Sequence, residues 1–236
     1  MTAQFQRTLI ERASHPYLSA GSFAWHFSKG KMSGDPVFVS LLQHGLIPDA
    51  LRLIDLGCGQ GLLASWLLEA RALYESGRWP QHWPPAPRLG SIWGLDLMGK
   101  NVERARAALG DRACFDTGDV CSTEFGQAGV VIMFDVLHYL DYDAQEDILR
   151  RVRAALPVGG TFITRIGDAA GGLPFHYSNW VDRTVIFLRE YRRARLYCRT
   201  LQDWLDLLKR KGFDVKILPV NRAAPFCNVT LIAKTV

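Results

Sequence analysis

A glycine-rich turn behind an acidic residue is the feature of this sequence that points most directly to chemistry. The apolar run Leu51–Leu56 carries Asp55 next to its end, and glycines follow at positions 57, 59 and 61. Glycine has no Cβ atom, so a ligand can approach the backbone of such a turn closely. A helical stretch comes next, and the first N–H groups of a helix have no partner within it. The pattern therefore predicts a binding site for a nucleotide-like ligand.

The acidic residue narrows the kind of nucleotide. Dinucleotide-binding turns carry Gly-x-Gly-x-x-Gly and hold a pyrophosphate, whereas this sequence has Gly-x-Gly-x-Gly. The carboxylate of Asp55 would repel a pyrophosphate and attract a cation. The run from Asp55 to Gly61 resembles motif I of the class I S-adenosylmethionine (SAM) methyltransferases, Asp-x-Gly-x-Gly-x-Gly, and SAM carries a sulfonium and an ammonium group. The residues that this resemblance assigns to SAM binding are Asp55, Gly57, Cys58, Gly59 and Gly61.

A second acid follows the next predicted strand. Asp96 ends that strand, and a carboxylate there can accept hydrogen bonds from both ribose hydroxyls of an adenosine. In the short dinucleotide-binding unit the acid follows the glycines by about 20 residues, but 35 positions separate Gly61 from Asp96. The proline-rich run Trp79–Pro87 accounts for the excess, since neither a helix nor a central strand tolerates that density of proline. We expect Leu97 and Met98 to flank the adenine.

A third acid lies in the run Thr117–Val120. In the family that motif I resembles, an acid at this place meets the adenine amino group, and the next apolar residue packs against the ring. The resemblance therefore implies these roles for Asp119 and Val120. Asp116 is an alternative, because a predicted strand end can shift by a few residues.

Two later runs complete the resemblance. Phe134–Tyr139 is similar to motif IV of the family, which implies that Asp135 lies at the mouth of the site beside the sulfonium. Leu156–Phe162 resembles the Leu-x-Pro-Gly-Gly-x-Leu turn of the family, with Val158 at a glycine-like position. These motifs occur in the family's order between residues 51 and 166, roughly half of the chain.

Methyl transfer to some acceptors needs a general base, and two histidines are the candidates. His138 belongs to the run that is similar to motif IV, and His176 lies in a loop after the fifth predicted strand. Ligands of such α/β sheets bind beyond the strand ends, and histidine titrates near neutral pH, as a general base should. Both histidines also have a purely structural interpretation. In the N-terminal segment, His26 could belong to a lid, and Lys29 and Lys31 could hold the SAM carboxylate or form a solvated basic turn. We expect no metal site, because the five cysteines include no Cys-x-x-Cys pair.

The elements that must position these residues alternate between strands and helices. This alternation predicts a doubly wound, mostly parallel α/β sheet, and the resemblance implies the seven-stranded Rossmann-like methyltransferase fold. The last two strands have a short link, so we expect one antiparallel strand. The predicted strands are residues 51–56, 91–95, 113–115, 130–134, 161–166, 215–220 and 229–233. Asp143 and Glu146 form a capping-box-like pattern that predicts the start of one helix, and Thr200 can cap another. The predicted domains are an N-terminal helical cap or lid at 1–50 and a SAM-binding core at 51–236, with a substrate-side insertion at 167–199.

The insertion carries the net charge of the protein. The chain has a formal charge of +5, and Arg183–Arg199 holds six arginines and one glutamate. A basic amphipathic helix there could lie solvated over the site, bind an acidic carrier protein or touch anionic lipid. Nucleic acid is less favoured, because the rest of the chain is neutral and has no recognised RNA-binding module. We expect a cytoplasmic location, since the sequence has neither an apolar run long enough for a membrane span nor a signal-like N-terminus.

The sequence therefore predicts a SAM-dependent methyltransferase that releases S-adenosylhomocysteine (SAH) and methylates a hydroxyl or carbon of a small aromatic or acyl-type acceptor. The run Lys29–Phe38 resembles methyltransferases of polyketide-like and aryl-polyene pigment pathways, which would suit an acceptor bound to a carrier protein. An RNA or protein methyltransferase is one alternative. It ranks lower because the Asn/Asp-Pro-Pro-Tyr signature of many amino-directed nucleic-acid enzymes is absent after Phe134. A SAM-binding scaffold or regulator without transferase activity is the other alternative. The sequence indicates neither the particular acceptor nor the oligomeric state.

Overall fold

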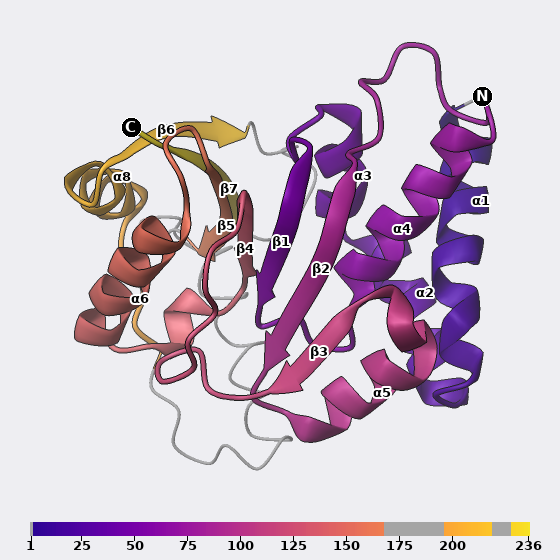
Figure 1. The fold of residues 1–236 in the computed structure, drawn as a ribbon, viewed down its shortest axis with the longest axis horizontal. Helices are drawn as coiled ribbons and strands as arrows, with labels where there is room; N and C mark the ends of the chain where they lie inside the picture. Colours follow the sequence, from indigo (N-terminus) through magenta and orange to yellow (C-terminus); the bar gives the residue numbers. More distant parts are fainter. Residues whose placement is uncertain (1, 168–195, 219–227) are drawn as a thin grey trace. The chain divides into compact units, whose positions relative to one another are not determined.

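The computed structural model describes residues 2–167, 196–218 and 228–236. It divides into two compact units, Met1–Val131 and Ile132–Val236. The strands of the described residues follow the order β3-β2-β1-β4-β5-β7-β6, which confirms the predicted seven-stranded sheet (Figure 1). The candidate base His176 and residues 183–195 of the arginine-rich segment lie outside the described residues.

Parallel strands form the sheet of the first unit. They are β1 (Ala50–Leu56), β2 (Leu89–Asp96) and β3 (Cys114–Thr117). Asp55 pairs with Gly94, and Asp96 pairs with Thr117. Because parallel strands end at the same edge of a sheet, the two acids that close β1 and β2 come to one edge, where ligands of such sheets bind.

Two helices connect these strands. α4 (Leu62–Glu75) follows the glycine-rich turn, and α5 (Gly99–Leu109) leads through the short 3-10 helix η2 (Gly110–Arg112) to β3. α4 buries nine of its 14 residues, far more than one face. A helix that is buried on most sides must be covered by more than one neighbour. The sheet covers one face of α4, so a second layer must cover the opposite face.

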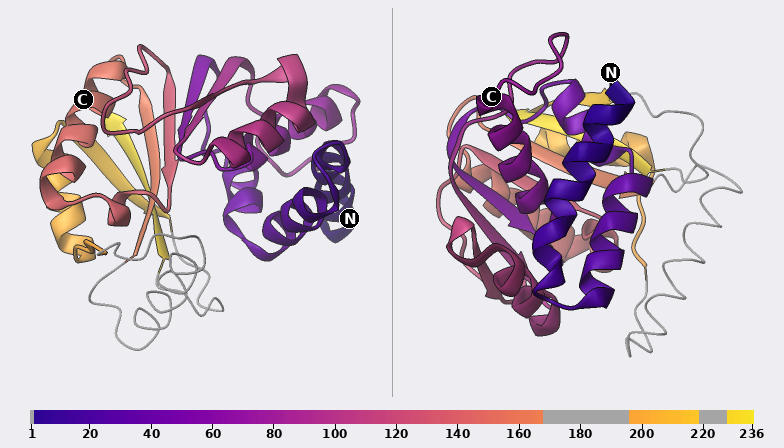
Figure 2. Two further views of the ribbon diagram at one scale, coloured as in Figure 1. Left: turned by 90° about the horizontal axis from the view of Figure 1, so that it is seen from below. Right: turned by 90° about the vertical axis from the view of Figure 1, so that its right-hand side faces the viewer.

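The N-terminal segment supplies that layer. It consists of α1 (Thr2–Ser14), the 3-10 helix η1 (His15–Leu18), α2 (Ser22–Gly34) and α3 (Val37–Gln43). α1 packs against both α4 and α2 (Figure 1 and Figure 2). The Ser65 hydroxyl of α4 donates to the Ala13 carbonyl at 2.7 Å, and the Trp66 indole donates to the Phe38 carbonyl at 2.8 Å. The segment is helical, and its action as a cap or lid of the site stays a prediction.

A buried acid adds to the same attachment. The Glu69 carboxylate of α4 accepts from Arg12 of α1 at 2.9 Å and from Arg112 of η2 at 2.7 Å. Glu69 is only 7% exposed. A buried carboxylate that loses its partners is strongly destabilising, so these ion pairs constrain where α1 and η2 can lie on α4.

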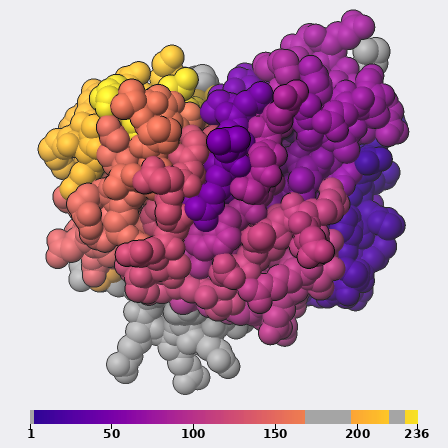
Figure 3. All heavy atoms as spheres, viewed as in Figure 1, coloured from indigo at the N-terminus to yellow at the C-terminus, as the bar shows by residue number. Residues whose placement is uncertain are grey.

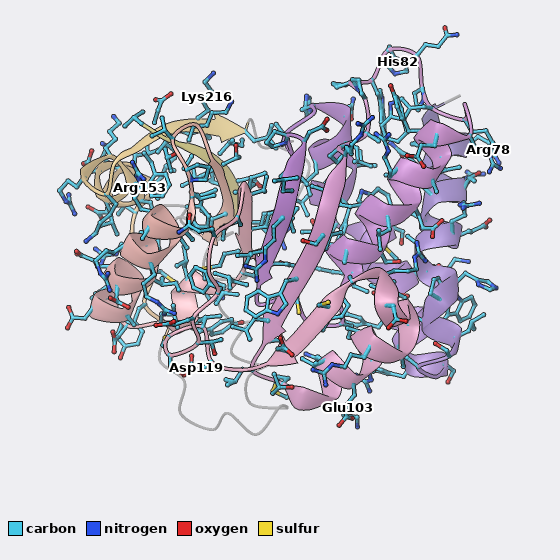
Figure 4. The ribbon with its side chains drawn as sticks, in the orientation of Figure 1. Arg78, His82, Glu103, Asp119, Arg153 and Lys216 are labelled. Carbon is cyan, nitrogen blue, oxygen red and sulfur yellow. The ribbon has the colours of Figure 1, made fainter. Side chains whose placement is uncertain are left out.

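The proline-rich loop between α4 and β2 is an ordered surface loop. The rings of Trp79 and Trp83 pack edge-on against Phe5 of α1, each with 5.3 Å between ring centroids. Trp83 is 5% exposed, whereas His82 beside it is exposed. Figure 3 shows the loop at the surface of the first unit, and Figure 4 labels His82 on it. The loop therefore has a structural role in covering one end of α1.

The second unit contains the antiparallel strand. β4 (Val130–Phe134) includes the boundary between the units, and β5 (Thr161–Gly167), β6 (Phe213–Leu218) and β7 (Asn228–Thr235) follow. β7 pairs antiparallel with both β5 and β6, which confirms the predicted hairpin and the single reversed strand.

The helices of the second unit begin at polar caps. α6 (Tyr142–Ala155) starts after Asp141, whose carboxylate accepts from the Ala144 amide at 2.9 Å. The predicted start at Asp143 was wrong, because Asp141 reaches the free amide first. α8 (Leu201–Arg210) starts at Thr200, as predicted, with a complete capping box. In the part of the chain that is described, no helix has the length and apolar character needed to span a membrane.

Candidate functional site

The glycine-rich turn is tightly folded and leaves backbone accessible. Gly57, Gly59 and Gly61 have φ of 80°, 55° and 73°, a region that side chains with a Cβ rarely adopt. A Cβ at Gly61 would lie 2.7 Å from the Phe115 ring, whereas a Cβ at Gly59 would meet nothing within 4 Å. The amides of Gly57 and Cys58 donate to the Leu95 carbonyl at 2.7 and 3.0 Å. Gly61 is therefore required for packing, and Gly59 leaves open space for a ligand.

Asp96 links this turn to the next helix. One carboxylate oxygen of Asp96 accepts from the Gly59 amide at 2.9 Å, and the other accepts from the Met98 amide at 2.9 Å. The Asn101 amide group approaches the second oxygen at 3.4 Å. Asp96 is half-buried, and the adjacent Leu97 is 54% exposed. A carboxylate oxygen has room for more than one hydrogen bond, so Asp96 can hold the turn and still accept from ligand hydroxyls.

Asp55 lies at the end of β1, just before the turn, with 5% of its surface exposed. Burial raises the pKa of Asp55 to about 7, and the negative charge of Asp96 contributes to the rise. The two carboxylates therefore repel each other in the absence of a cation. A positively charged ligand beside them would favour the ionised form of Asp55, which is the response expected of a site for a cationic group.

Two acids were candidates for the contact with adenine, and the structure gives them different surroundings. Asp119 is exposed beyond the end of β3 (Figure 4), and one of its carboxylate oxygens accepts from the Cys121 amide at 2.8 Å. The next residue, Val120, is buried. Asp116 lies within β3 and accepts from the Trp93 indole at 2.7 Å and from Arg106 at 3.1 Å. An acid with two structural partners is the weaker candidate, which favours Asp119.

Asp135 has an unusual backbone conformation and a strong partner. Its φ is 58°, the one positive value among the described residues that are not glycine. Asp135 accepts from the Arg165 Nε at 2.8 Å and also from the Arg165 Nη2. Arg165 is 8% exposed, and its guanidinium lies 5.6 Å from the centre of the Phe134 ring. Strained residues concentrate at functional sites. Sequence reasoning missed Arg165, although a single charge in the apolar strand 161–166 was a signal for it.

His138 lies in the 3-10 turn η3 (Leu137–Tyr139), and one buried side chain secures this turn. The Gln145 amide nitrogen donates to the carbonyls of Leu137 and Leu140 at 3.0 Å and to that of Tyr197 at 2.8 Å. The Gln145 oxygen accepts from Arg199 at 2.7 Å. The Tyr197 amide in turn donates to the His138 carbonyl at 2.9 Å.

The structure therefore brings the sequence-predicted residues together in two sets. The first unit holds the turn, Asp55, Asp96, Leu97, Asp119 and Val120, and the second unit holds Asp135 and His138. Within the first set, open backbone over Gly59, a buried acid and a half-buried acid fit a ligand that carries a cationic group and vicinal hydroxyls, as SAM does.

The N-terminal residues with possible roles at the site have other neighbours. The Lys29 ammonium lies 5.4 Å from the centre of the Trp25 ring, and Lys31 forms an ion pair with Asp35 at 2.8 Å. His26 is exposed on α2. These contacts favour the interpretation of the two lysines as part of the helix surface rather than as ligands of the SAM carboxylate.

Comparison with known proteins finds similarity to methyltransferases over part of the chain. Residues 54–164 match the family described as a methyltransferase domain. A 115-residue stretch is 30% identical to carboxy-S-adenosyl-L-methionine synthase of Chromohalobacter salexigens, covering 46% of this chain and 37% of that enzyme. The chain thus matches well under half of the length of this curated relative.

Solved structures agree on the fold. An O-methyltransferase family protein from Burkholderia thailandensis superimposes with a TM-score of 0.63 at 18% identity, over 92% of this chain and 61% of that one. Magnesium protoporphyrin IX methyltransferase from Synechocystis PCC 6803 with bound SAH gives 0.57 at 18% identity, over 91% and 88%. The domain match over residues 54–164 and the shared Rossmann-like fold support a class I, SAM-dependent methyltransferase.

Proposed function

We propose that this protein transfers the methyl group of SAM to a hydroxyl or carbon of a small aromatic or acyl-type acceptor and releases SAH. The observation that carries the proposal is the joint placement of Gly59 and Asp96, because it combines an open backbone with a carboxylate at the ends of β1 and β2. SAM, when bound, supplies an electrophilic methyl group on a positively charged sulfur.

The residues of the first unit would bind and orient. Asp96 accepts hydrogen bonds from the ribose hydroxyls, and its position is set by the amides of Gly59 and Met98. The ionised form of Asp55 favours a cationic ligand, because its burial leaves the charge poorly solvated. Asp119 accepts from the adenine amino group while Val120 and Leu97 contact the ring.

The residues of the second unit would serve the acceptor. His138 is the proposed general base, held by the Gln145 contacts to its turn. His176 is the second proposed base and lies outside the described residues. The similarity to motif IV assigns Asp135 a place beside the sulfonium. Arg165 donates to the Asp135 carboxylate and would hold it in position. Placement of reactants in line supplies much of the catalysis in such a displacement.

The small-molecule acceptor is favoured by the names of the similar structures. One is an O-methyltransferase family protein, and another acts on magnesium protoporphyrin IX. An acidic carrier protein that docks at Arg183–Arg199 is the proposed means of delivery for an acyl-type acceptor, through complementary charge. An RNA or protein acceptor and a scaffold that binds SAM without turnover are the competing functions.

The test combines binding with turnover. Calorimetry with SAM and SAH on the wild type should give micromolar dissociation constants, and Asp96→Ala should abolish measurable binding. Asp111→Ala is the matched control, because Asp111 is an exposed carboxylate on η2 that has no role in the proposed site, so SAM binding should stay unchanged. Transfer of labelled methyl to phenols or carrier-bound aryl acids would then establish the acceptor class. Absence of SAM and SAH binding by the wild type would contradict the proposal, and binding without transfer to any acceptor would favour the scaffold.

A further inference from the structure

A buried phenol from the N-terminal segment reaches the glycine-rich turn. Tyr17 ends up fully buried at the end of η1, and its hydroxyl donates to the Gln60 carbonyl at 2.8 Å. Gln60 stands between Gly59 and Gly61 in the proposed SAM-binding turn. We propose that Tyr17 is a positioning residue for SAM binding, through which the N-terminal helices set the conformation of this turn. The inference rests on the proposed function.

The hydrogen bond from Tyr17 holds the peptide plane between Gln60 and Gly61 at its carbonyl end. The carbonyl of Gln60 and the amide of Gly61 belong to the same planar unit. The Gly61 amide donates to the Cys58 carbonyl at 2.9 Å, and Tyr17 holds the opposite end of the plane. Rotation of this plane would change the dihedral angles on both sides of it, including the left-handed φ of Gly61.

The contact that the ligand needs is made by the peptide plane between Cys58 and Gly59, two planes earlier in the turn. The Gly59 amide donates to Asp96, so the orientation of residues 58 and 59 sets the carboxylate that would accept from ribose. Glycines leave the turn with many accessible backbone conformations. Groups outside the turn must therefore stabilise one of these conformations. Among the described residues, Tyr17 is the side chain that holds the C-terminal half of the turn.

Contacts on both sides of η1 hold Tyr17 in place, and its hydroxyl stays protonated. The chain is attached to the core on both sides of η1, since the Ala13 carbonyl at the end of α1 accepts from Ser65 at 2.7 Å and the hydroxyl of Ser19, the residue after η1, donates to the Ala107 carbonyl at 2.8 Å. Burial raises the pKa of the Tyr17 phenol, and the nearby Cys58 and Asp55 raise it further. The hydroxyl therefore keeps its proton across the physiological range and can only act as a donor to the carbonyl.

The N-terminal segment makes a polar contact with the turn that the sequence did not indicate. The segment covers α4, but it also places one polar atom within reach of the turn 43 positions away. A purely apolar cover would leave the Gln60 carbonyl without this donor. A buried carbonyl that loses its partner carries a desolvation penalty, so removal of the hydroxyl should relax the turn rather than leave it unchanged.

The test uses Tyr17→Phe, which keeps the buried ring and removes the hydroxyl. Tyr74→Phe is the matched control, because Tyr74 lies on α4 and packs edge-on against Trp79 away from the turn. Calorimetry with SAH should show a dissociation constant roughly 3- to 10-fold higher for Tyr17→Phe, the range expected for one buried hydrogen bond. Tyr74→Phe should bind as the wild type does.

A second readout does not depend on any ligand. Amide hydrogen exchange of the free protein should be faster for residues 57–61 in Tyr17→Phe, while exchange within β1 serves as the internal reference. Unchanged exchange in the turn would overturn the inference, whether or not SAH binds. Equal acceleration in β1 would also overturn it, because that pattern indicates general destabilisation. If the wild type fails to bind SAH, the proposed function fails, and the exchange result still decides whether Tyr17 positions the turn.

Discussion

The amide of Gly59 donates a hydrogen bond to a carboxylate oxygen of Asp96 at 2.9 Å, across 37 positions of sequence. The two motifs that were expected to contact different parts of one ligand are therefore already connected in the protein. Asp96 has a structural role in the turn as well as a proposed role as a ligand acceptor. This double role determines how substitutions at the position should behave.

Asp96→Asn should retain part of the function that Asp96→Ala loses. Asparagine keeps one oxygen that can accept from the Gly59 or Met98 amide, but it lacks the negative charge and the second acceptor. Hydrogen bonds to charged groups contribute about 1.5–3 kcal/mol. We therefore expect SAH to bind roughly 10- to 100-fold more weakly to Asp96→Asn than to the wild type. Calorimetry measures this, and an affinity equal to that of the wild type would show that the charge is not used.

The raised pKa of Asp55 should make SAM binding depend on pH. With a pKa of about 7, Asp55 is mostly protonated at pH 6 and mostly ionised at pH 8. The ionised form attracts a cation, so SAM should bind more tightly as pH rises, by at most tenfold per pH unit below the pKa. Calorimetric titrations between pH 6 and pH 8 measure the slope. Asp55→Asn should flatten the profile, and an equally steep profile in that variant would assign the effect to another group.

Asp55 should also make the free energy of unfolding depend on pH. Rising pH should strengthen SAM binding but lower the stability of the free protein. The folded pKa of about 7 lies above the unfolded value near 3.9, so the folded state binds more protons than the unfolded state between these values. The contribution of Asp55 to the free energy of unfolding therefore falls as pH rises from about 4 to about 7. Urea unfolding of the wild type and Asp55→Asn should show the variant gaining relative stability from pH 5 to pH 8. A constant difference would contradict the shift.

Gln145→Met should destabilise the second unit. Gln145 is fully buried, donates to three carbonyls and accepts from Arg199. Methionine fills a similar volume without these hydrogen bonds, so the carbonyls lose a buried donor. We expect the free energy of unfolding to fall by about 2–4 kcal/mol, since each unsatisfied buried group costs about 1–3 kcal/mol.

The matched control for this variant is Gln202→Met. Gln202 is exposed on α8 and makes one hydrogen bond to Asp206 at 3.0 Å. Its substitution should change stability by less than about 0.5 kcal/mol. Equal effects of the two substitutions in denaturant titrations would show that the buried contacts of Gln145 contribute little.

Two substitutions that remove the charge of Asp135 should differ in stability because of its left-handed backbone conformation. Asparagine tolerates a φ of 58°, whereas alanine pays about 1–2 kcal/mol in the left-handed region. Both variants leave the buried Arg165 without its carboxylate. Asp135→Ala should therefore be less stable than Asp135→Asn by about 1 kcal/mol or more. Equal stabilities in urea unfolding would indicate that the backbone relaxes at this position.

Local sequence signals were sufficient for much of the fold. The alternation of apolar runs with helical segments predicted all seven strands, and the short link between the last two predicted the reversed β7. The Thr200 cap was also predicted, because a threonine before an apolar face has a local preference for that position. The α6 cap was misplaced by two residues, since several acids compete for the same free amides near a helix start.

The sequence by itself determined the glycine-rich turn and the acids Asp55, Asp96 and Asp119, because strand ends and turn chemistry are encoded by adjacent residues. Only the tertiary structure decided which distant groups hold them. Tyr17 reaches Gln60, Arg165 reaches Asp135 and Gln145 gathers three carbonyls. These contacts join residues between 5 and 52 positions apart. A hydrogen bond between such residues depends on how the elements pack against one another, and the periodicity within one element specifies which face is buried but not which distant group meets it.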